Sequence, residues 1–484
     1  MKSLHSGNTT SPKVSIQRVF GLFDRSSRLV LHPFLFGFWA IIESSYTPGK
    51  LSWWSTLGAL FILSLGIGLV IGLLYLVSRD SIKAGICASI LMAPLLDLQA
   101  MVLTIGMVVP ELGRYRYAVP LIIAVVSIAI VYVIKSRRTF RTANQALNIL
   151  FGLLVVLSAS FLIAKPLPRQ VSAVPNITFT QETESSSDSA HYPDIYYFIL
   201  DSYTSSPSLK EHWGFDNNEF LSQLRRRGFY VAERSESPYT TTVRSVATSL
   251  NMDTAAASND SWAAIRTNIV VKYLRAHNFT ICNYSLFDID QYPKFYSYWN
   301  PEEGSNSDIR SLFRATGIVY LIGALQSLDM PRQTLRILAQ IVSSCKESKM
   351  SPKFVYAHLM TPHFPYCFDE GGKIIPWLQQ KGATDKSGYL EQLIGTNALI
   401  LAVIDSVLEL SKDDPIIIVQ GDHGSRLFSG EEGFLESHTI LNAYHLPKGG
   451  NDLLYPTISP VNSFRLIFDR YFGQKLPLVK DFGK

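Results

Sequence analysis

The sequence predicts an α-helical membrane domain of about five transmembrane helices, followed by an α/β domain with a central, mostly parallel sheet. Three observations predict this architecture. Long apolar segments that are almost free of charge lie before residue 166. Residues 166–192 are polar and Ser-rich, which is typical of a linker. From residue 193 onward, short apolar runs alternate with amphipathic segments. The expected domains are therefore 1–165, a linker at 166–192, and 193–484.

Four apolar segments are long enough to cross a bilayer core, which needs about 20 residues. They are residues 56–78, 84–109, 117–134 and 146–164. We count a fifth span at 29–44, although His32 and Pro33 interrupt its start, because the basic residues alternate between loops as five spans require. These residues cluster before the first span and after the second and fourth spans: Lys13, Arg18, Arg25, Arg28, Arg79, Lys83, Lys135, Arg137, Arg138 and Arg141. The positive-inside rule then places the N-terminus in the cytoplasm and the chain after Lys165 outside.

The composition excludes some classes of protein. Only 17% of the residues are charged, against about 25% in a typical soluble domain, which argues against a disordered or fully soluble chain. The part after residue 165 is mildly acidic, so nucleic acid is not an expected partner. Cys282, Cys345 and Cys367 lie in the predicted outer domain, where they form at most one disulfide or remain buried thiols.

The C-terminal domain alternates strands with helices, which is typical of a mostly parallel sheet. The apolar runs Ile195–Leu200, Lys353–Leu359 and Pro415–Gln420 predict buried strands. Helical periodicity predicts helices over Asn217–Arg227 and Tyr389–Leu410. In such sheets the ligand site lies beyond the carboxyl ends of the strands. We therefore look for functional residues directly after the predicted strands.

Three candidate metal ligands follow two of these strands. Asp201 ends the first strand, and Asp422 and His423 follow the Pro415–Gln420 strand after Gly421. Two carboxylates and an imidazole suit a divalent cation such as Mn²⁺ or Zn²⁺. An Asp after a strand can also be an ordinary turn or cap residue. The tetrapeptide GDHG is a stronger signal, because its glycines let the backbone approach a ligand closely.

Five segments carry a resemblance to a known family. They are PDIYYFILDSY (193–203), GFDNNEFLSQLRRRGFYVAERSESPYTTTVRSVATSLNM (214–252), YAHLMTPHFPYCFD (356–369), IIIVQGDHGSR (416–426) and SPVNSFRLIFDRYFG (459–473). Together they resemble the sulfatase-like branch of the alkaline phosphatase superfamily. Within that branch the chain resembles bacterial membrane-anchored enzymes of the lipoteichoic acid synthase and phosphoethanolamine transferase kind, which have the same layout of five spans and an outer catalytic domain. The resemblance implies an alkaline-phosphatase-like (sulfatase-like) fold for residues of about 190–475.

The resemblance implies one divalent metal, Mn²⁺ or Zn²⁺ with Mg²⁺ as a further candidate, held by Asp201, Thr242, Asp422 and His423. Thr242 would be the nucleophile, since Thr242 and Ser245 match the threonine and serine that open a helix in phosphoethanolamine transferases; Thr240 and Thr241 are alternative positions. Independently, metal coordination and a helix N-terminus would both make this hydroxyl a better nucleophile. A hydroxyl-rich run before a helix can also serve only as a cap.

Further residues are candidates for substrate binding and proton transfer. The stretch TPHFPY places His363 where lipoteichoic acid synthases have a phosphate-contacting His, and His438 follows His423 at a spacing similar to that in phosphoethanolamine transferases. Either imidazole could bind phosphate or protonate a leaving group. Arg426 could hold a non-bridging phosphate oxygen. Each of the three also has an ordinary structural explanation.

The implied function is transfer of a phospho-head group, of the phosphoglycerol or phosphoethanolamine type, through a phospho-threonine. The implied donor is a phospholipid, the acceptor an envelope glycan or lipid, and the location a bacterial cell membrane with a periplasmic or extracellular catalytic domain. The pattern C/S-x-P-x-R is missing, which disfavours a formylglycine sulfatase, and so is the GKT of lipoteichoic acid synthases. The alternatives are a phosphoester or sulfoester hydrolase with the same site, and a non-catalytic transport or sensing protein, which Asp97 within a span suggests.

Overall fold

The structure is a computed structural model. It describes residues 28–44, 53–113, 115–164, 177, 179, 192–257, 260–296, 328–346, 352–428 and 430–482. The chain divides into two compact units, which we describe separately. Nearly all of the predicted linker 166–192 lies outside the described residues, as do Lys13, Arg18 and Arg25. The exact domain boundaries therefore stay predictions.

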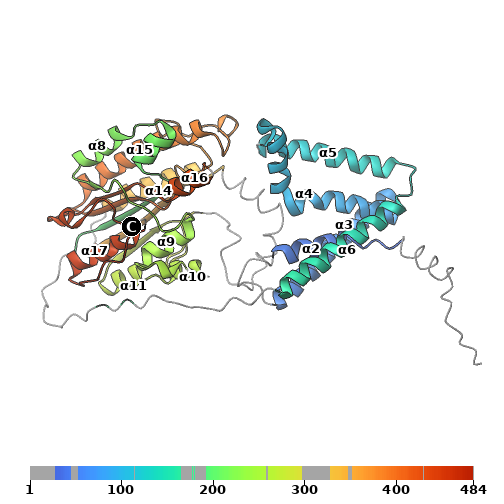
Figure 1. The fold of residues 1–484 in the computed structure, drawn as a ribbon, viewed down its shortest axis with the longest axis horizontal. Coiled ribbons are helices and arrows are strands. Elements are labelled where there is room, and N and C mark those ends of the chain that lie inside the picture. Colours follow the sequence, from blue (N-terminus) through green and yellow to red (C-terminus); the bar gives the residue numbers. More distant parts are fainter. Residues whose placement is uncertain are drawn as a thin grey trace, which may run out of the picture. The chain divides into compact units, whose positions relative to one another are not determined.

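The N-terminal unit consists of apolar helices (Figure 1). Their bounds are α2 His32–Ser44, α3 Trp53–Ser78, α4 Ser81–Val108, the 3₁₀ helix η1 Pro110–Gly113, α5 Tyr115–Lys135 and α6 Arg141–Ala164. Helices α3, α4, α5 and α6 are each long and apolar enough to cross a membrane. Helix α2 has 13 residues and is about 20 Å long, which is shorter than a bilayer core of about 30 Å. The four long spans are confirmed as apolar helices, and a fifth crossing by α2 stays a prediction.

Polar contacts show the relative direction of these helices. Asn148 in α6 accepts the His32 backbone N–H through Oδ1 (2.7 Å), and His32 Nδ1 lies 2.7 Å from Ser89 Oγ in α4. The starts of α2, α4 and α6 therefore meet at one side of the unit. Lys83 Nζ donates to the Ser136 carbonyl at the end of α5 (2.6 Å), so that end lies there too. The described basic residues between α3 and α4 and between α5 and α6 consequently lie at one side of the unit, as the positive-inside argument requires.

Asp97 interrupts α4. Its backbone is non-helical (φ −146°, ψ 51°), and its Oδ1 accepts the Ala100 N–H at 3.3 Å. Pro94, one turn earlier, has no N–H for the helical hydrogen bond and favours a kink. Asp97 thus caps the second half of α4. Asp97 therefore has a local structural role, and the transport or sensing alternative stays a prediction.

The second unit is built on a six-stranded sheet with strand order β2-β6-β5-β1-β4-β3. The strands are β1 Ile195–Leu200, β2 Tyr230–Val231, β3 Thr280–Tyr284, β4 Lys353–Leu359, β5 Ile416–Gly421 and β6 Asn442–His445. Strands β3, β4, β1 and β5 pair in parallel, and β6 and β2 add an antiparallel edge. The predicted mostly parallel sheet is confirmed. Leu200 is in register with Leu359 and Gly421, so three strands end together.

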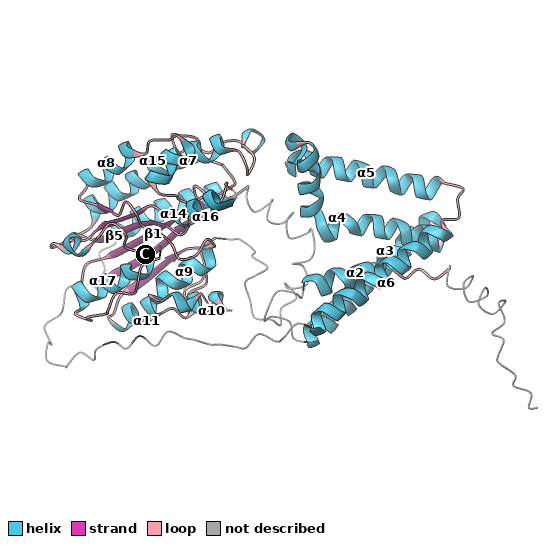
Figure 2. Ribbon diagram, in the orientation of Figure 1, coloured by secondary structure: helices cyan, strands magenta, loops and turns pink. Residues whose placement is uncertain are grey.

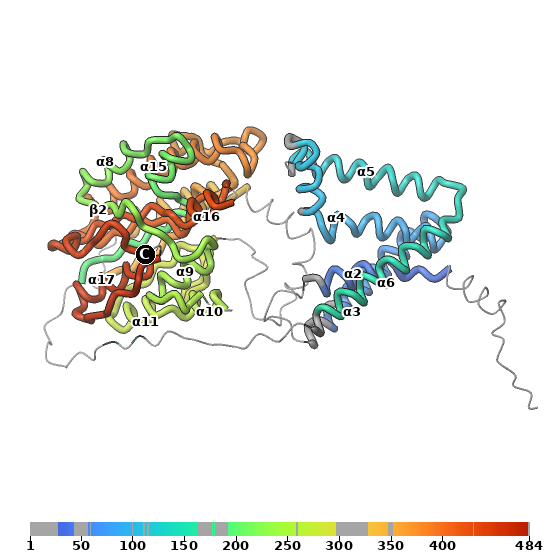
Figure 3. The backbone as a smooth tube through the Cα atoms, in the orientation of Figure 1, coloured from blue at the N-terminus to red at the C-terminus, as the bar shows by residue number. Residues whose placement is uncertain are grey.

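Helices cover both faces of this sheet (Figure 2). The α-helices are α7 Ser206–Trp213, α8 Asn218–Arg226, α9 Thr242–Asn251, α10 Ser261–Arg266, α11 Ile269–Ala276, α14 Met330–Cys345, α15 Lys386–Leu410, α16 Gly430–His438 and α17 Pro460–Phe472. The 3₁₀ helices are η2 Thr254–Ala256, η3 Trp377–Gln379 and η4 Gly450–Leu453. Helices α8 and α15 lie on one face, and α9, α11 and α17 on the other. The tube in Figure 3 shows α17 beside α9, far apart in sequence but in contact.

The core of this unit is rich in aromatic residues. Tyr196, Tyr197 and Phe198 of β1 are among the largest fully buried side chains. Helix α15 is apolar enough to span a membrane, but Leu393 and Ile400 are buried in the sheet core, so α15 is a core helix of the α/β unit. None of the four cysteines, all of which are described, forms a disulfide bond. The disulfide left open by the sequence is therefore not formed.

Candidate metal centre

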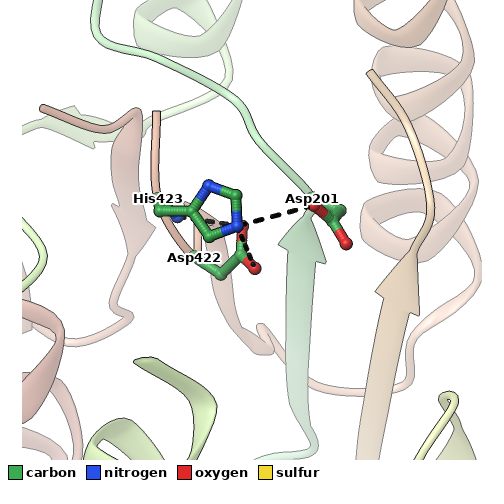
Figure 4. A group of neighbouring side chains, drawn as sticks. All are labelled: Asp201, Asp422 and His423. Carbon is green, nitrogen blue, oxygen red and sulfur yellow. Dashed lines mark hydrogen bonds and ion pairs between the residues drawn. The ribbon is translucent and has the colours of Figure 1, made fainter. Parts of the chain in front are cut away.

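The site begins where the central strands end. Asp201 follows β1, and its N–H donates to the Leu359 carbonyl of β4 at 3.0 Å. Asp422 follows β5. Because Leu200 and Gly421 are register partners, Asp201 and Asp422 leave the sheet side by side. Figure 4 shows both carboxylates at the strand ends, with the His423 ring next to Asp422 and dashed lines from the ring to both aspartates. The parallel register thus produces the cluster that the sequence predicts.

Asp201, Asp422 and His423 form a compact buried group. Each offers one possible ligand atom, and these atoms lie within 4.8 Å of one another. His423 Nε2 is 3.5 Å from Asp422 Oδ2 and 3.9 Å from Asp201 Oδ1. Oxygen and imidazole nitrogen ligands at this spacing could hold one divalent cation.

The hydrogen bonds around the group leave His423 Nε2 and Asp422 Oδ2 with lone pairs that could bind a cation. His423 Nδ1 lies 2.8 Å from the Gly424 carbonyl, which can only accept, so in the neutral ring Nδ1 carries the proton and Nε2 a lone pair. Asp422 Oδ1 accepts the N–H groups of Ser202 and His423, both at 2.9 Å. Asp422 Oδ2 is buried and has no hydrogen-bond partner among the described residues. A cation would satisfy this orphaned oxygen, so the residues present fit a metal.

Asp201 is surrounded by histidines. Burial alone would raise the pKa of Asp201, but nearby imidazoles, His363 foremost and then His358 and His423, outweigh burial and hold that pKa below its ordinary value. The adjacent Ser202 has a left-handed backbone (φ 63°), an uncommon conformation for a residue other than glycine. Its N–H is held by Asp422, and its carbonyl accepts the Tyr389 hydroxyl at 2.8 Å. The turn after β1 is therefore fixed from two sides.

The glycines of the GDHG stretch have a different role from the one expected. A Cβ on Gly421 would lie 2.3 Å from the Tyr203 carbonyl oxygen, and one on Gly424 would lie 2.0 Å from the Glu436 carbonyl oxygen. Real Cβ atoms do not approach backbone oxygens so closely. These glycines therefore make room for the chain's own backbone, and the expectation that they admit a ligand is corrected.

Thr242 is the first residue of α9, and its Oγ1 lies 3.3 Å from His423 Nε2. Thr241 is the N-cap residue, although its side chain makes no capping hydrogen bond. The structure thus brings Thr242, of the three consecutive threonines, against the Asp–Asp–His group. Ser245 serves a different purpose: its Oγ donates to the Tyr239 carbonyl at 2.8 Å and fixes the loop before the helix.

His363 and Arg426 meet on the loops that follow β4 and β5. Arg426 Nη2 is 3.4 Å from His363 Nε2, and the His363 N–H donates to the Asp201 carbonyl at 3.0 Å. The fully buried Gln392 of α15 anchors the His363 loop: its Nε2 donates to the His363 carbonyl at 2.7 Å, and its Oε1 accepts the Cys367 N–H at 2.6 Å. The exposed guanidinium of Arg426 and the partly buried imidazole of His363 thus lie next to the turn that carries Asp201.

His438 occupies a different place. It ends α16, its Nδ1 lies 2.7 Å from the Ser237 carbonyl, and its ring stacks on Phe482 with centroids 4.6 Å apart. These contacts support the loop that leads into α9. Among the described residues, His438 does not belong to the group of possible metal ligands. Its predicted contact with the substrate stays a prediction.

His358 was not recognised from the sequence. It is fully buried in β4, and its Nε2 lies 3.5 Å from Asp201 Oδ2. The available signal was a histidine in an otherwise apolar strand, one residue before the strand's carboxyl end. Apolar runs are assigned to the core as a whole, so a single titratable residue inside one is easily passed over.

No protein-family model and no curated protein sequence matches the chain. Among solved structures, the C-terminal periplasmic domain of EcEptC from Escherichia coli, in complex with Zn, is 10% identical (TM-score 0.38; 58% of this chain and 83% of that chain). The periplasmic domain of the phosphoethanolamine transferase EptC from Campylobacter jejuni is 12% identical (TM-score 0.39; 60% and 92%). A protein in the alkaline phosphatase superfamily from Vibrio parahaemolyticus is 13% identical (TM-score 0.38; 58% and 66%).

Proposed function

We propose that this protein transfers a phospho-head group, of the phosphoglycerol or phosphoethanolamine type, from a phospholipid to an envelope glycan or lipid. The observation that carries the proposal is the position of Thr242. Its hydroxyl lies at the start of α9, 3.3 Å from His423 Nε2, which in turn belongs to a buried group with two carboxylates. A hydroxyl against a candidate cation site is an arrangement suited to nucleophilic catalysis.

Asp201, Asp422, His423 and the Thr242 hydroxyl would hold one divalent cation, Zn²⁺ or Mn²⁺ by the chemistry of the donors. When bound, the cation lowers the proton affinity of the hydroxyl and stabilises negative charge on the phosphoryl oxygens. The N-terminus of α9 adds positive potential at the same point.

Thr242 Oγ1 forms a bond to phosphorus, and the bond from phosphorus to the oxygen of diacylglycerol breaks. The proton lost by Thr242 is matched by the proton that the departing alcohol gains. An acceptor hydroxyl then attacks the phospho-threonine, and Thr242 recovers a proton as its oxygen leaves. Arg426 would contact a non-bridging oxygen, and His363 would pass the proton to the leaving alcohol.

The membrane helices support a phospholipid as the donor. Four long apolar helices in the same chain would keep the catalytic unit tethered to a bilayer, where head groups are concentrated. On this reading the protein is a multi-pass protein of a bacterial cell membrane, with the catalytic unit on the periplasmic or extracellular side.

Peptide mass spectrometry tests the proposal. Full-length protein incubated with phospholipid vesicles should carry a head-group phosphate on the peptide that contains Thr242. The Thr242→Ala variant should lack the adduct, and the neighbouring Thr241→Ala variant should keep it. A wild-type protein that turns over lipid without any covalent adduct would contradict the mechanism. Release of the head group only to water, with every acceptor tested, would favour the hydrolase alternative.

A further inference from the structure

The buried histidine of β4 has a hydrogen-bond pattern that ties it to the candidate metal centre. His358 is fully buried, and its ring meets Phe287 edge-on with centroids 5.7 Å apart. Its polar contacts are Asp201 Oδ2 at Nε2 (3.5 Å) and the Tyr356 hydroxyl at Nδ1 (3.4 Å). An imidazole is costly to bury unless its nitrogens are satisfied. The two contacts account for both ring nitrogens.

These contacts fix which nitrogen carries the proton. The Asp201 carboxylate can only accept, so the neutral ring must donate from Nε2 and accept at Nδ1. Burial raises the pKa of Tyr356 well above its ordinary value, so its hydroxyl keeps its proton and can donate to Nδ1. His423 has the opposite tautomer, because its Nδ1 donates to the Gly424 carbonyl. One imidazole therefore presents a lone pair to the centre, and the other presents an N–H.

We propose that His358 is a positioning residue for the metal centre, and that its Nε2–H holds Asp201 Oδ2 so that Oδ1 faces Asp422 and His423. The inference rests on the metal-dependent function proposed above. The two oxygens of Asp201 accordingly have separate tasks. Oδ2 receives the His358 N–H, whereas Oδ1 accepts the Ser202 hydroxyl at 3.0 Å and lies 3.9 Å from His423 Nε2. Tyr356 acts indirectly, through His358. By donating to His358 Nδ1, it favours the tautomer whose Nε2–H can donate to Asp201.

The test is metal affinity, which can be measured without turnover. Groups that orient metal ligands typically contribute about 10- to 100-fold to affinity. In the full-length protein, His358→Leu should weaken Zn²⁺ or Mn²⁺ binding by about this factor, measured by competition with a chromophoric chelator. His358→Gln should restore most of the affinity, since its amide can donate to Asp201. Tyr356→Phe should cause a smaller loss in the same direction.

His445→Leu provides a matched control, because His445 Nε2 pairs with Asp414 at 2.7 Å in another part of the sheet unit. It should leave metal affinity unchanged. Unchanged affinity in a folded His358→Leu protein would overturn the proposal. Equal losses in the Leu and Gln variants, with equal drops in the melting temperature of the metal-free protein, would also overturn it. Normal metal binding without a Thr242 adduct would refute the proposed transferase and leave the role of His358 intact. A wild-type protein that binds neither cation would overturn both.

Discussion

Replacing Thr242 by alanine separates a chemical role from a structural one. The side chain lies at the first position of α9 and is only partly buried, and its hydroxyl contacts His423 Nε2 at 3.3 Å. Loss of one such neutral hydrogen bond costs about 0.5–1.5 kcal/mol, and the better helix propensity of alanine offsets part of it. The net change should stay within about 1 kcal/mol, equivalent to about 2–4 °C in Tm for a unit of this size. Turnover, by contrast, should fall to background.

The assay pairs a thermal melt with head-group transfer from labelled phospholipid. Thr242→Ser should keep partial activity, because a primary hydroxyl can occupy the same position. Thr240→Ala and Thr241→Ala are controls that should keep most activity. Near-normal turnover in Thr242→Ala, together with a drop in Tm well beyond 4 °C, would refute the reasoning and leave the threonine with a purely structural role.

Three further outcomes are expected. Asp422→Ala should remove most bound divalent cation, since it deletes the orphaned Oδ2, and elemental analysis that finds full metal content in the folded variant would place the site elsewhere. Gly424→Ala should destabilise the unit by about 1–3 kcal/mol, because the new Cβ would meet the Glu436 carbonyl oxygen; a melting temperature equal to wild type would contradict this close approach. A reporter active only in the cytoplasm, fused after Lys484, should be silent; strong activity would indicate an even number of spans, most simply through α2 not crossing.

Much of the sheet could be predicted because its central strands are continuous apolar runs. Ile195–Leu200 and Lys353–Leu359 match β1 and β4 at both ends, and Pro415–Gln420 is shifted by one residue from β5. The antiparallel edge was not predicted, because a two-residue β2 and a four-residue β6 leave no periodic signal. Their pairing depends on contacts between distant parts of the chain.

The candidate ligands were accessible to sequence reasoning because each follows a strand, and parallel strands deliver their ends to one rim. The role of His358 was not accessible, since it depends on which neighbour each ring nitrogen meets. The same limit applies to Gly421, whose need for a small residue comes from Tyr203, far away in sequence. Hydropathy alone does not distinguish α15 from a membrane span, because a buried core helix can be equally apolar, but the strands before and after Tyr389–Leu410 correctly assigned this helix to the α/β domain.

The Gln392 side chain has a consequence for how a substrate would be received. Its amide makes two donor contacts, to the carbonyls of His363 and Pro365, and accepts from Cys367 and Phe368, which uses its full hydrogen-bonding capacity. These hydrogen bonds therefore hold the loop after β4 in one conformation against α15. A substrate phosphate that binds His363 would contact a loop that is already ordered. Little of the binding free energy would then be lost in ordering the loop after β4. Differences in affinity between head groups should then appear mainly in dissociation rates, with association rates nearly constant.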